Sequence, residues 1–189
     1  MLEIYLIRHG ETAWSKVGRH TGITDIPLTE EGKKECEGLY RKIQDIKFNT
    51  IYCSPLERAK QTCEICHLLD KAQISSDLLE WDYGDYDGMT SKEVHLTDPN
   101  WTIFSKDPKN GETSHQVGVR ADRMIKEVLK LEGKVAIFSS GHFLRALAAR
   151  WLSLPVSCGM YFAFSTAEHA ILSFENGNQV VKSWGIPPL

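Results

Sequence analysis

The sequence lacks a long apolar run, an excess of positive charge and an even set of cysteines. The apolar stretch in MLEIYLIRHG is too short to span a bilayer and follows no basic segment, so we expect neither a membrane anchor nor export. A formal net charge of -3 argues against attraction of the whole chain to nucleic acid. The five scattered cysteines fit reduced thiols and a cytoplasmic location better than a disulfide framework.

What the sequence does contain is enough apolar material for one core. Of its 189 residues, 42% are hydrophobic and 25% are charged, which is typical of a globular protein. No internal repeat, low-complexity tract or linker divides the chain. We therefore expect a single domain over residues 1–189.

Segments with strand and helix patterns alternate along the chain. Residues 2–7 are nearly all apolar, which predicts a strand buried on both faces, and further strands are expected at 50–53, near residue 74 and at 134–139. Residues 13–28 and 81–110 are expected to be irregular, and Asn176-Gly177 predicts a final hairpin. Helices are expected after Thr29, from Ser54-Pro55, from about Thr113 to Leu131, and after Gly141. This order implies an α/β three-layer sandwich, with a mostly parallel sheet flanked by helices.

Polar residues follow directly after several of these strands. His9, the segment 54–58 and the segment 140–142 all occupy such positions. Because ligands gather at the carboxyl ends of parallel strands, we expect these segments to meet at one rim of the sheet.

Arg8, His9 and Arg58 are the strongest candidates for chemistry at that rim. An imidazole can act as a nucleophile or a base, and a guanidinium matches the oxygens of phosphate. Arg58 also lies in the first turn of a predicted helix, whose N-terminus favours an anion. Each residue alone could be a bonded strand-end histidine or a solvated arginine, but together they favour an anion site.

A series of motifs in this chain resembles the histidine phosphatase superfamily, in its phosphoglycerate mutase-like branch. The motifs are LIRHGET at 6–12, TGITDIPLT at 21–29, SPLERAKQT at 54–62, LEWDYGDYDG at 79–88, GET at 111–113 and SGHFLR at 140–145. Their order and their spread over most of the chain make the resemblance specific. It implies a phosphoglycerate mutase-like fold.

The resemblance also assigns roles to individual residues. It implies that His9 accepts the phosphoryl group and that Glu80 gives a proton to the leaving oxygen. The phosphate-binding residues that it implies are Arg8, Arg58, Ser15, Thr21, Gly22, Ser140, Gly141 and His142. No cofactor and no metal are expected, because positioning and positive charge can carry an in-line phosphoryl transfer.

The chain departs from the family pattern at Ser140, where relatives carry a second catalytic histidine. A hydroxyl can donate a hydrogen bond there but cannot supply a positive charge. His142, two residues further on, is a candidate to take over part of that role. Ser15 replaces an asparagine of many relatives and resembles sedoheptulose bisphosphatase-like members, which favours a sugar phosphate as substrate.

These features predict a phosphatase that hydrolyses a small phosphorylated metabolite through a phosphohistidine on His9. One alternative is a phosphoglycerate mutase, although mutase relatives are longer and close their pocket with added segments. Another is a phospholigand-binding protein whose catalysis is weakened by Ser140. The expected partner is the small-molecule substrate, with no nucleic acid and no membrane, and a homodimer is left open.

Cys63, Cys66 and His67 match the spacing of a haem-attachment motif. They fall in a predicted helix, no export signal accompanies them, and no second cysteine pair completes a zinc site. We therefore expect no haem or metal at these residues.

Overall fold

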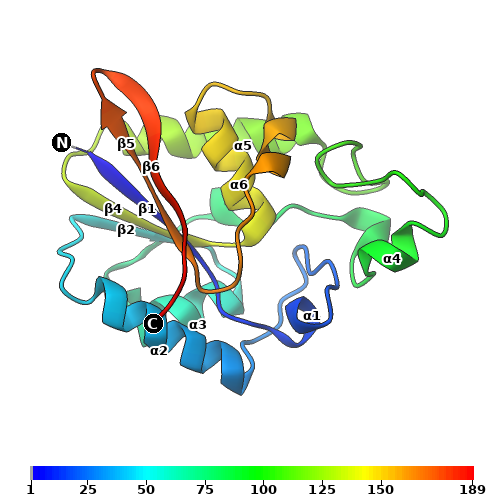
Figure 1. Ribbon diagram of the computed structural model, residues 1–189, viewed down its shortest axis with the longest axis horizontal. Coiled ribbons are helices and arrows are strands. Elements are labelled where there is room, and N and C mark those ends of the chain that lie inside the picture. The colour runs from blue at the N-terminus through cyan, green and yellow to red at the C-terminus, as the bar shows by residue number, and fades with distance from the viewer. Residues whose placement is uncertain (1) are drawn as a thin grey trace.

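Apolar runs form a mixed sheet, which is the middle layer of the computed structural model (Figure 1). The structure describes residues 2–189. In sheet order the strands are β3 Gln73–Ile74, β2 Thr50–Cys53, β4 Lys134–Ser139, β1 Glu3–Arg8, β5 His169–Glu175 and β6 Asn178–Ile186. The first four are parallel neighbours, whereas β5 pairs antiparallel with β1, and β6 antiparallel with β5. The predicted α/β sandwich around a mostly parallel sheet is therefore confirmed.

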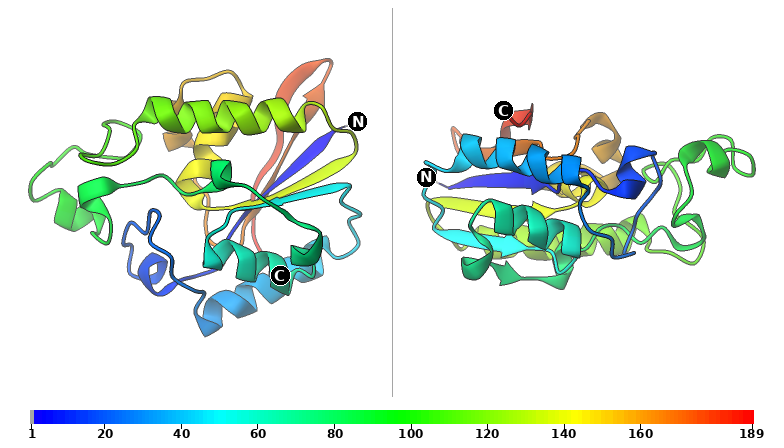
Figure 2. Two further views of the ribbon diagram at one scale, coloured as in Figure 1. Left: turned by 180° about the vertical axis from the view of Figure 1, so that it is seen from behind. Right: turned by 90° about the horizontal axis from the view of Figure 1, so that it is seen from below.

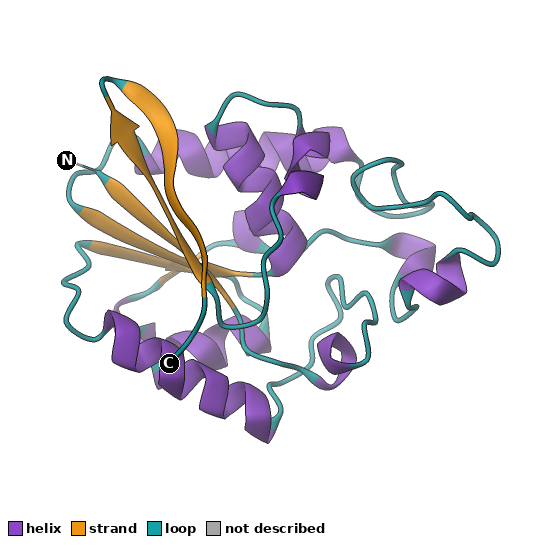
Figure 3. Ribbon diagram, in the orientation of Figure 1, coloured by secondary structure: helices purple, strands orange, loops and turns teal. Residues whose placement is uncertain are grey.

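Side chains of the central strands alternate between two separate hydrophobic cores. On β1, Ile4 and Leu6 pack into one core and Ile7 packs into the other. Helices α5 Ser114–Val128 and α6 Gly141–Trp151 cover the first core, and α2 Glu30–Ile43 and α3 Glu57–Ile65 cover the second (Figure 3). A strand buried on both faces is apolar at nearly every position, which explains the continuous run that the sequence shows there.

Capping side chains set the starts of the long helices. Thr29 accepts a hydrogen bond from the Gly32 N–H at 3.0 Å, as the sequence predicts for the start of α2. Thr113 begins α5 with a capping box that it shares with Gln116. These predicted starts are confirmed, although α5 ends at Val128 rather than at residue 131.

The predicted hairpin is also present at the end of the sheet. Asn176 and Gly177 join β5 to β6, with φ values of 51° and 81°. Both values lie in the left-handed region that a tight hairpin turn requires, and these residue types adopt it readily.

Two local expectations are wrong. Helix α3 begins at Glu57 instead of Ser54, because the Ser54 hydroxyl accepts the Leu56 N–H at 3.4 Å and the chain turns before the helix starts. The expected loop at 13–28 contains a one-turn helix, α1 Ala13–Lys16, which Thr12 caps by accepting the Ser15 N–H at 3.1 Å. Short helices with a single cap are hard to predict from apolar spacing.

The segment 81–110 is irregular, as expected, and carries the short helix α4 Ser91–Val94. Together with α1 it projects beyond the edge where β1 ends (Figure 2). It is tied to the loop after α1 by the hydrogen bonds His20 N to Met89 O and Gly88 N to His20 O, at 2.8 and 2.7 Å. Residues far apart in sequence are thus brought together over one rim of the sheet.

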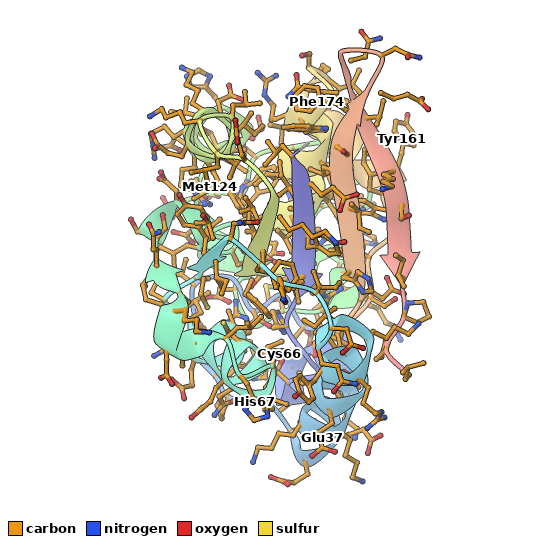
Figure 4. The ribbon with its side chains drawn as sticks, turned by 90° about the vertical axis from the view of Figure 1, so that its left-hand side faces the viewer. Glu37, Cys66, His67, Met124, Tyr161 and Phe174 are labelled. Atoms are coloured by element: carbon orange, nitrogen blue, oxygen red, sulfur yellow. The ribbon has the colours of Figure 1, made fainter. Side chains whose placement is uncertain are left out.

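Cys63 on α3 and Cys66 just after it are buried in the second core. His67 follows with a φ of 57°, and Figure 4 labels Cys66 and His67. Within residues 2–189, no group of three or more histidine, cysteine or acidic side chains is arranged to hold a metal ion. None of the helices in the described part of the chain combines the length and apolarity needed to cross a membrane.

Candidate active site

A cavity of about 270 Å³, here called the rim cavity, lies at the carboxyl ends of β1 and β4. Its lining consists of Arg8, His9, Ser15, Gly18, Arg19, His20, Thr21, Arg58, Glu80, Tyr83, Ser91, Gly141, His142 and Arg145. Of the site residues predicted from the sequence, Gly22 and Ser140 are absent from this lining, and both contact Arg58 instead. The structure therefore brings the predicted residues to one place.

His9 is held in one orientation immediately after β1. Its Nδ1 lies 2.7 Å from the carbonyl oxygen of Gly10, and because a carbonyl can only accept, Nδ1 carries the hydrogen. Burial, followed by the charges of Arg58 and Arg8, holds the pKa of His9 well below its ordinary value. The imidazole is therefore neutral near pH 7, and its Nε2 has a free lone pair suited to nucleophilic attack.

Arg8 and Arg58 flank this imidazole. Arg8 donates through Nη1 to the Phe164 carbonyl, and its buried Nε has no partner among the described residues. Arg58 is fully buried and donates to the hydroxyl of Ser140 and to two loop carbonyls. Within residues 2–189 neither guanidinium forms an ion pair with a carboxylate. Because a buried charge without a counter-ion is costly, this pair is built to receive an anion.

A tight turn positions the Arg58 guanidinium. Arg58 donates to the carbonyls of Thr24 and Gly22 at 2.9 and 2.7 Å. The Thr24 hydroxyl donates in turn to Asp87 at 2.7 Å, so the irregular segment 81–110 supports the turn. Gly22 has a φ of +51°, and an added Cβ would lie 3.0 Å from the ring of Tyr83, which explains glycine at this position.

Glu80 lines the cavity and also holds the start of α6. Its Oε1 accepts the N–H groups of Trp81 and Phe143 at 2.9 and 2.7 Å, and its Oε2 accepts that of His142 at 3.0 Å. Ser140 occupies the N-cap position but makes no capping hydrogen bond through its side chain. The carboxyl of Glu80 thus does the capping, and its Oε2 keeps room for a further bond toward the cavity.

The ring that faces the cavity from this helix belongs to His142, because Ser140 is fully buried against Arg58. His142 Nδ1 is hydrogen-bonded to the hydroxyl of Tyr83. Burial raises the pKa of Tyr83 well above its ordinary value, and burial together with Arg145 holds the pKa of His142 well below its own. A protonated hydroxyl therefore meets a neutral imidazole at this point.

Sequence reasoning gave no role to several lining residues. Arg145 belongs to the motif SGHFLR, which pointed to the site, but the motif does not indicate where the Arg145 side chain points. His20, Arg19 and Tyr83 come from irregular segments, where residue spacing does not reveal which side chains meet.

A neutral imidazole between two unpaired arginines, at the strand ends of an α/β sandwich, is the kind of site that phosphoryl transfer requires. The chain belongs to the histidine phosphatase superfamily (branch 1), whose family model matches residues 4–187. The predicted family, fold class and class of enzyme, a phosphatase, are confirmed.

Individual relatives agree with this membership. The chain is 36% identical to an acid phosphatase of Mycobacterium tuberculosis over 178 residues, covering 92% of this chain and 87% of that one. It is 34% identical to sedoheptulose 1,7-bisphosphatase of Saccharomyces cerevisiae, covering 80% of this chain and 68% of the relative. The solved structure of an open reading frame product from Mycobacterium tuberculosis matches with a TM-score of 0.94 at 34% identity, covering 98% and 97% of the two chains.

Proposed function

We propose that this protein hydrolyses a small sugar phosphate by transferring the phosphoryl group to His9, within one domain spanning residues 1–189. The observation that carries the proposal is the geometry of His9. Its Nδ1–H is fixed on the Gly10 carbonyl, which leaves Nε2 free in a cavity that also contains Arg8 and Arg58.

The reaction has two steps. In the first, His9 Nε2 attacks phosphorus, the bond to the leaving oxygen breaks, and the carboxyl of Glu80 gives that oxygen a proton. In the second, water attacks phosphorus, the P–N bond breaks, and the Glu80 carboxylate takes a proton from the water. Inorganic phosphate leaves and both residues return to their starting forms. Arg8 and Arg58 neutralise the charge on the remaining phosphoryl oxygens in both steps.

The remaining predicted residues shape the phosphate position. Ser15, Thr21, Gly141 and His142 line the cavity, and Gly22 and Ser140 hold Arg58 in place. The hydroxyl of Ser15 is bonded to the backbone of Thr12 at 2.8 and 3.1 Å, so it acts mainly by shaping the loop. A sugar phosphate is supported by the similarity to sedoheptulose 1,7-bisphosphatase.

The experiment is an assay of phosphate release from a panel of sugar phosphates, phosphoglycerates and p-nitrophenyl phosphate, with His9→Ala in parallel. We expect release by the wild-type protein and none by His9→Ala, with the variant still folded, because His9 follows β1 and belongs to neither hydrophobic core. Full turnover by His9→Ala would exclude the mechanism. Transfer of the phosphoryl group between two metabolites, without release of phosphate, would indicate a mutase instead.

A further inference from the structure

The arginines of the described chain divide by whether a carboxylate neutralises them. Those in ion pairs are Arg19 with Glu93, Arg120 with Glu112, Arg123 with Asp77 and Arg150 with Asp122. Within residues 2–189 the unpaired ones are Arg8, Arg58, Arg145 and the exposed Arg41. Arg8 and Arg58 serve the phosphoryl group, so Arg145 is a sheltered cation that the proposed reaction does not use.

Contacts with backbone and ring hold Arg145 at one orientation. Its Nε and Nη2 donate to the carbonyls of Gly159 and Met160 at 3.0 and 3.2 Å, and its guanidinium carbon lies 4.6 Å from the centre of the Phe104 ring. Nη1 has no hydrogen-bond partner in residues 2–189, yet it is not among the fully buried unpartnered atoms, so it remains accessible. A fixed guanidinium with one free edge can bind an anionic oxygen at little cost in side-chain entropy.

Arg145 lines both the rim cavity and a second one of about 300 Å³, here called the distal cavity. The two share His20, Ser91, His142 and Arg145. The rest of the distal lining is His95, Trp101, Thr102, Ile103, Phe104 and Met160. Arg8, His9 and Arg58 are absent from this lining, so the distal cavity lies on the far side of the shared residues from the phosphoryl position.

The charges and donors of the distal cavity favour an anion. Its lining holds no carboxylate, and Arg145 is its one guanidinium or ammonium group. The indole N–H of Trp101 is fully buried and unpartnered in the described chain, so this donor is not exposed to the cavity. Ring faces of Phe104 and Trp101 make the remaining surface apolar, and an anion there is less screened than in water.

We propose that Arg145 binds a second anionic group, a phosphate or a carboxylate, carried by the leaving group of the substrate. The inference rests on the proposed function and narrows it. The preferred substrate has two anionic groups, of which one is transferred to His9 while the other is held at the entrance to the distal cavity.

Matched substrate pairs test this inference. Glycerol 3-phosphate and 3-phosphoglycerate differ by a carboxylate, and fructose 6-phosphate and fructose 1,6-bisphosphate differ by a phosphate, so the two pairs separate the anion types. We expect wild-type kcat/KM to be at least about tenfold higher for the doubly anionic member of one pair, as a charge-assisted hydrogen bond provides. Arg145→Met should remove that preference while changing kcat/KM for p-nitrophenyl phosphate only a few-fold.

Arg150→Met is the matched control. Arg150 lies on the same helix, is paired with Asp122 at 2.9 Å, and lines neither cavity, so the preference should persist in this variant. A wild-type protein without preference in either pair, or an Arg145→Met variant that keeps it, overturns the proposal. An equal loss on every substrate also overturns it, because Arg145 would then only support the carbonyls of Gly159 and Met160.

A binding measurement covers two further cases. If Arg145→Met does not fold, or if the wild-type protein hydrolyses nothing, the affinities of 3-phosphoglycerate and fructose 1,6-bisphosphate for His9→Ala can be compared with those of their singly anionic partners. Tighter binding of a doubly anionic ligand by about tenfold supports the role of Arg145 even where the proposed hydrolysis fails. Equal affinities within both pairs contradict it.

Discussion

The two ends of the site are built in different ways. At the phosphoryl end, His9 and Arg8 belong to the end of a central strand, and Arg58 sits in the first turn of α3. At the distal end, α6 carries Arg145, and the walls come from the irregular residues 101–104 and from Met160 in the 3-10 helix Val156–Tyr161. Arg8, Arg58 and Arg145 thus lie on regular elements and Glu80 lies in a loop, whereas the walls of the distal cavity come mainly from irregular segments. Changes in these loops can therefore alter which substrate is bound without altering the reaction itself.

The largest effect is expected at Glu80, which is proposed to give its proton to the leaving group, the part of the substrate between the two ends of the site. We expect Glu80→Gln to lower kcat/KM for a sugar phosphate by about a hundredfold or more, the usual range for general acid catalysis. For p-nitrophenyl phosphate, whose leaving group needs no proton, kcat/KM should fall far less. Glutamine retains one oxygen for the N–H groups of Trp81 and Phe143, and melting curves check that α6 stays folded.

Equal losses on both substrates would contradict that role. They would indicate that Glu80 acts by capping α6 and not by giving a proton to the leaving oxygen.

Ser140 offers a test confined to the phosphoryl end. The Ser140 hydroxyl accepts from Arg58 and does not line the rim cavity, so position 140 supplies the phosphoryl group with no charged donor. Losing one aimed donor commonly costs about a hundredfold to a thousandfold in turnover. We expect Ser140→His to raise kcat by at least roughly tenfold and to change KM little, since Arg8 and Arg58 remain. Steady-state kinetics and a melting curve are the measurements, because position 140 is fully buried.

An unchanged kcat in a folded Ser140→His protein would mean that the transferred group does not meet residue 140. His142→Ala then decides whether the neighbouring imidazole already fills that role.

The smallest expected effect is on stability, and it compares the site with the sheet beside it. Burial, with the charge of Lys42 as a second cause, lowers the pKa of His169 on β5 to about 4, and burial also lowers the pKa values of His9 and His142. These imidazoles are neutral in both the folded and the unfolded protein above about pH 6.5. As the pH falls from about 6.5 to about 5, the unfolded chain binds protons that the folded chain excludes, so the free energy of unfolding falls.

Each such histidine adds up to about 1.4 kcal/mol per pH unit to the slope of the free energy of unfolding against pH. In His169→Phe the free energy of unfolding should therefore fall less steeply with decreasing pH, by the contribution of about one histidine. Catalysis should remain unchanged, because His169 does not line either cavity. Urea unfolding at several pH values measures the slope. An identical slope in the variant would show that His169 is free to take up a proton in the folded protein.

The sequence predicted the phosphoryl end and missed most of the distal end for one physical reason. Apolar spacing predicts the strand that ends before His9. Arg58 lies in the first turn of α3 as expected, although the capping signal at Ser54 placed the helix start too early. Trp101 and His20 lie in irregular segments, where a partner is chosen by long-range packing that leaves no local pattern. Ser140 was recognised as a departure, but its burial against Arg58 and the Tyr83–His142 bond depend on three-dimensional contacts.

The central claim is that His9 carries the phosphoryl group, and trapping the intermediate tests it most directly. In Glu80→Gln, p-nitrophenyl phosphate should still phosphorylate the protein, while hydrolysis slows because no carboxylate activates water. Quenching in alkali, digestion and mass spectrometry should find a phosphoryl group on the peptide containing His9, labile in acid, and none in the Glu80→Gln, His9→Ala double variant. A phosphoryl group on another residue, or phosphate release by His9→Ala at the wild-type rate, would contradict the account.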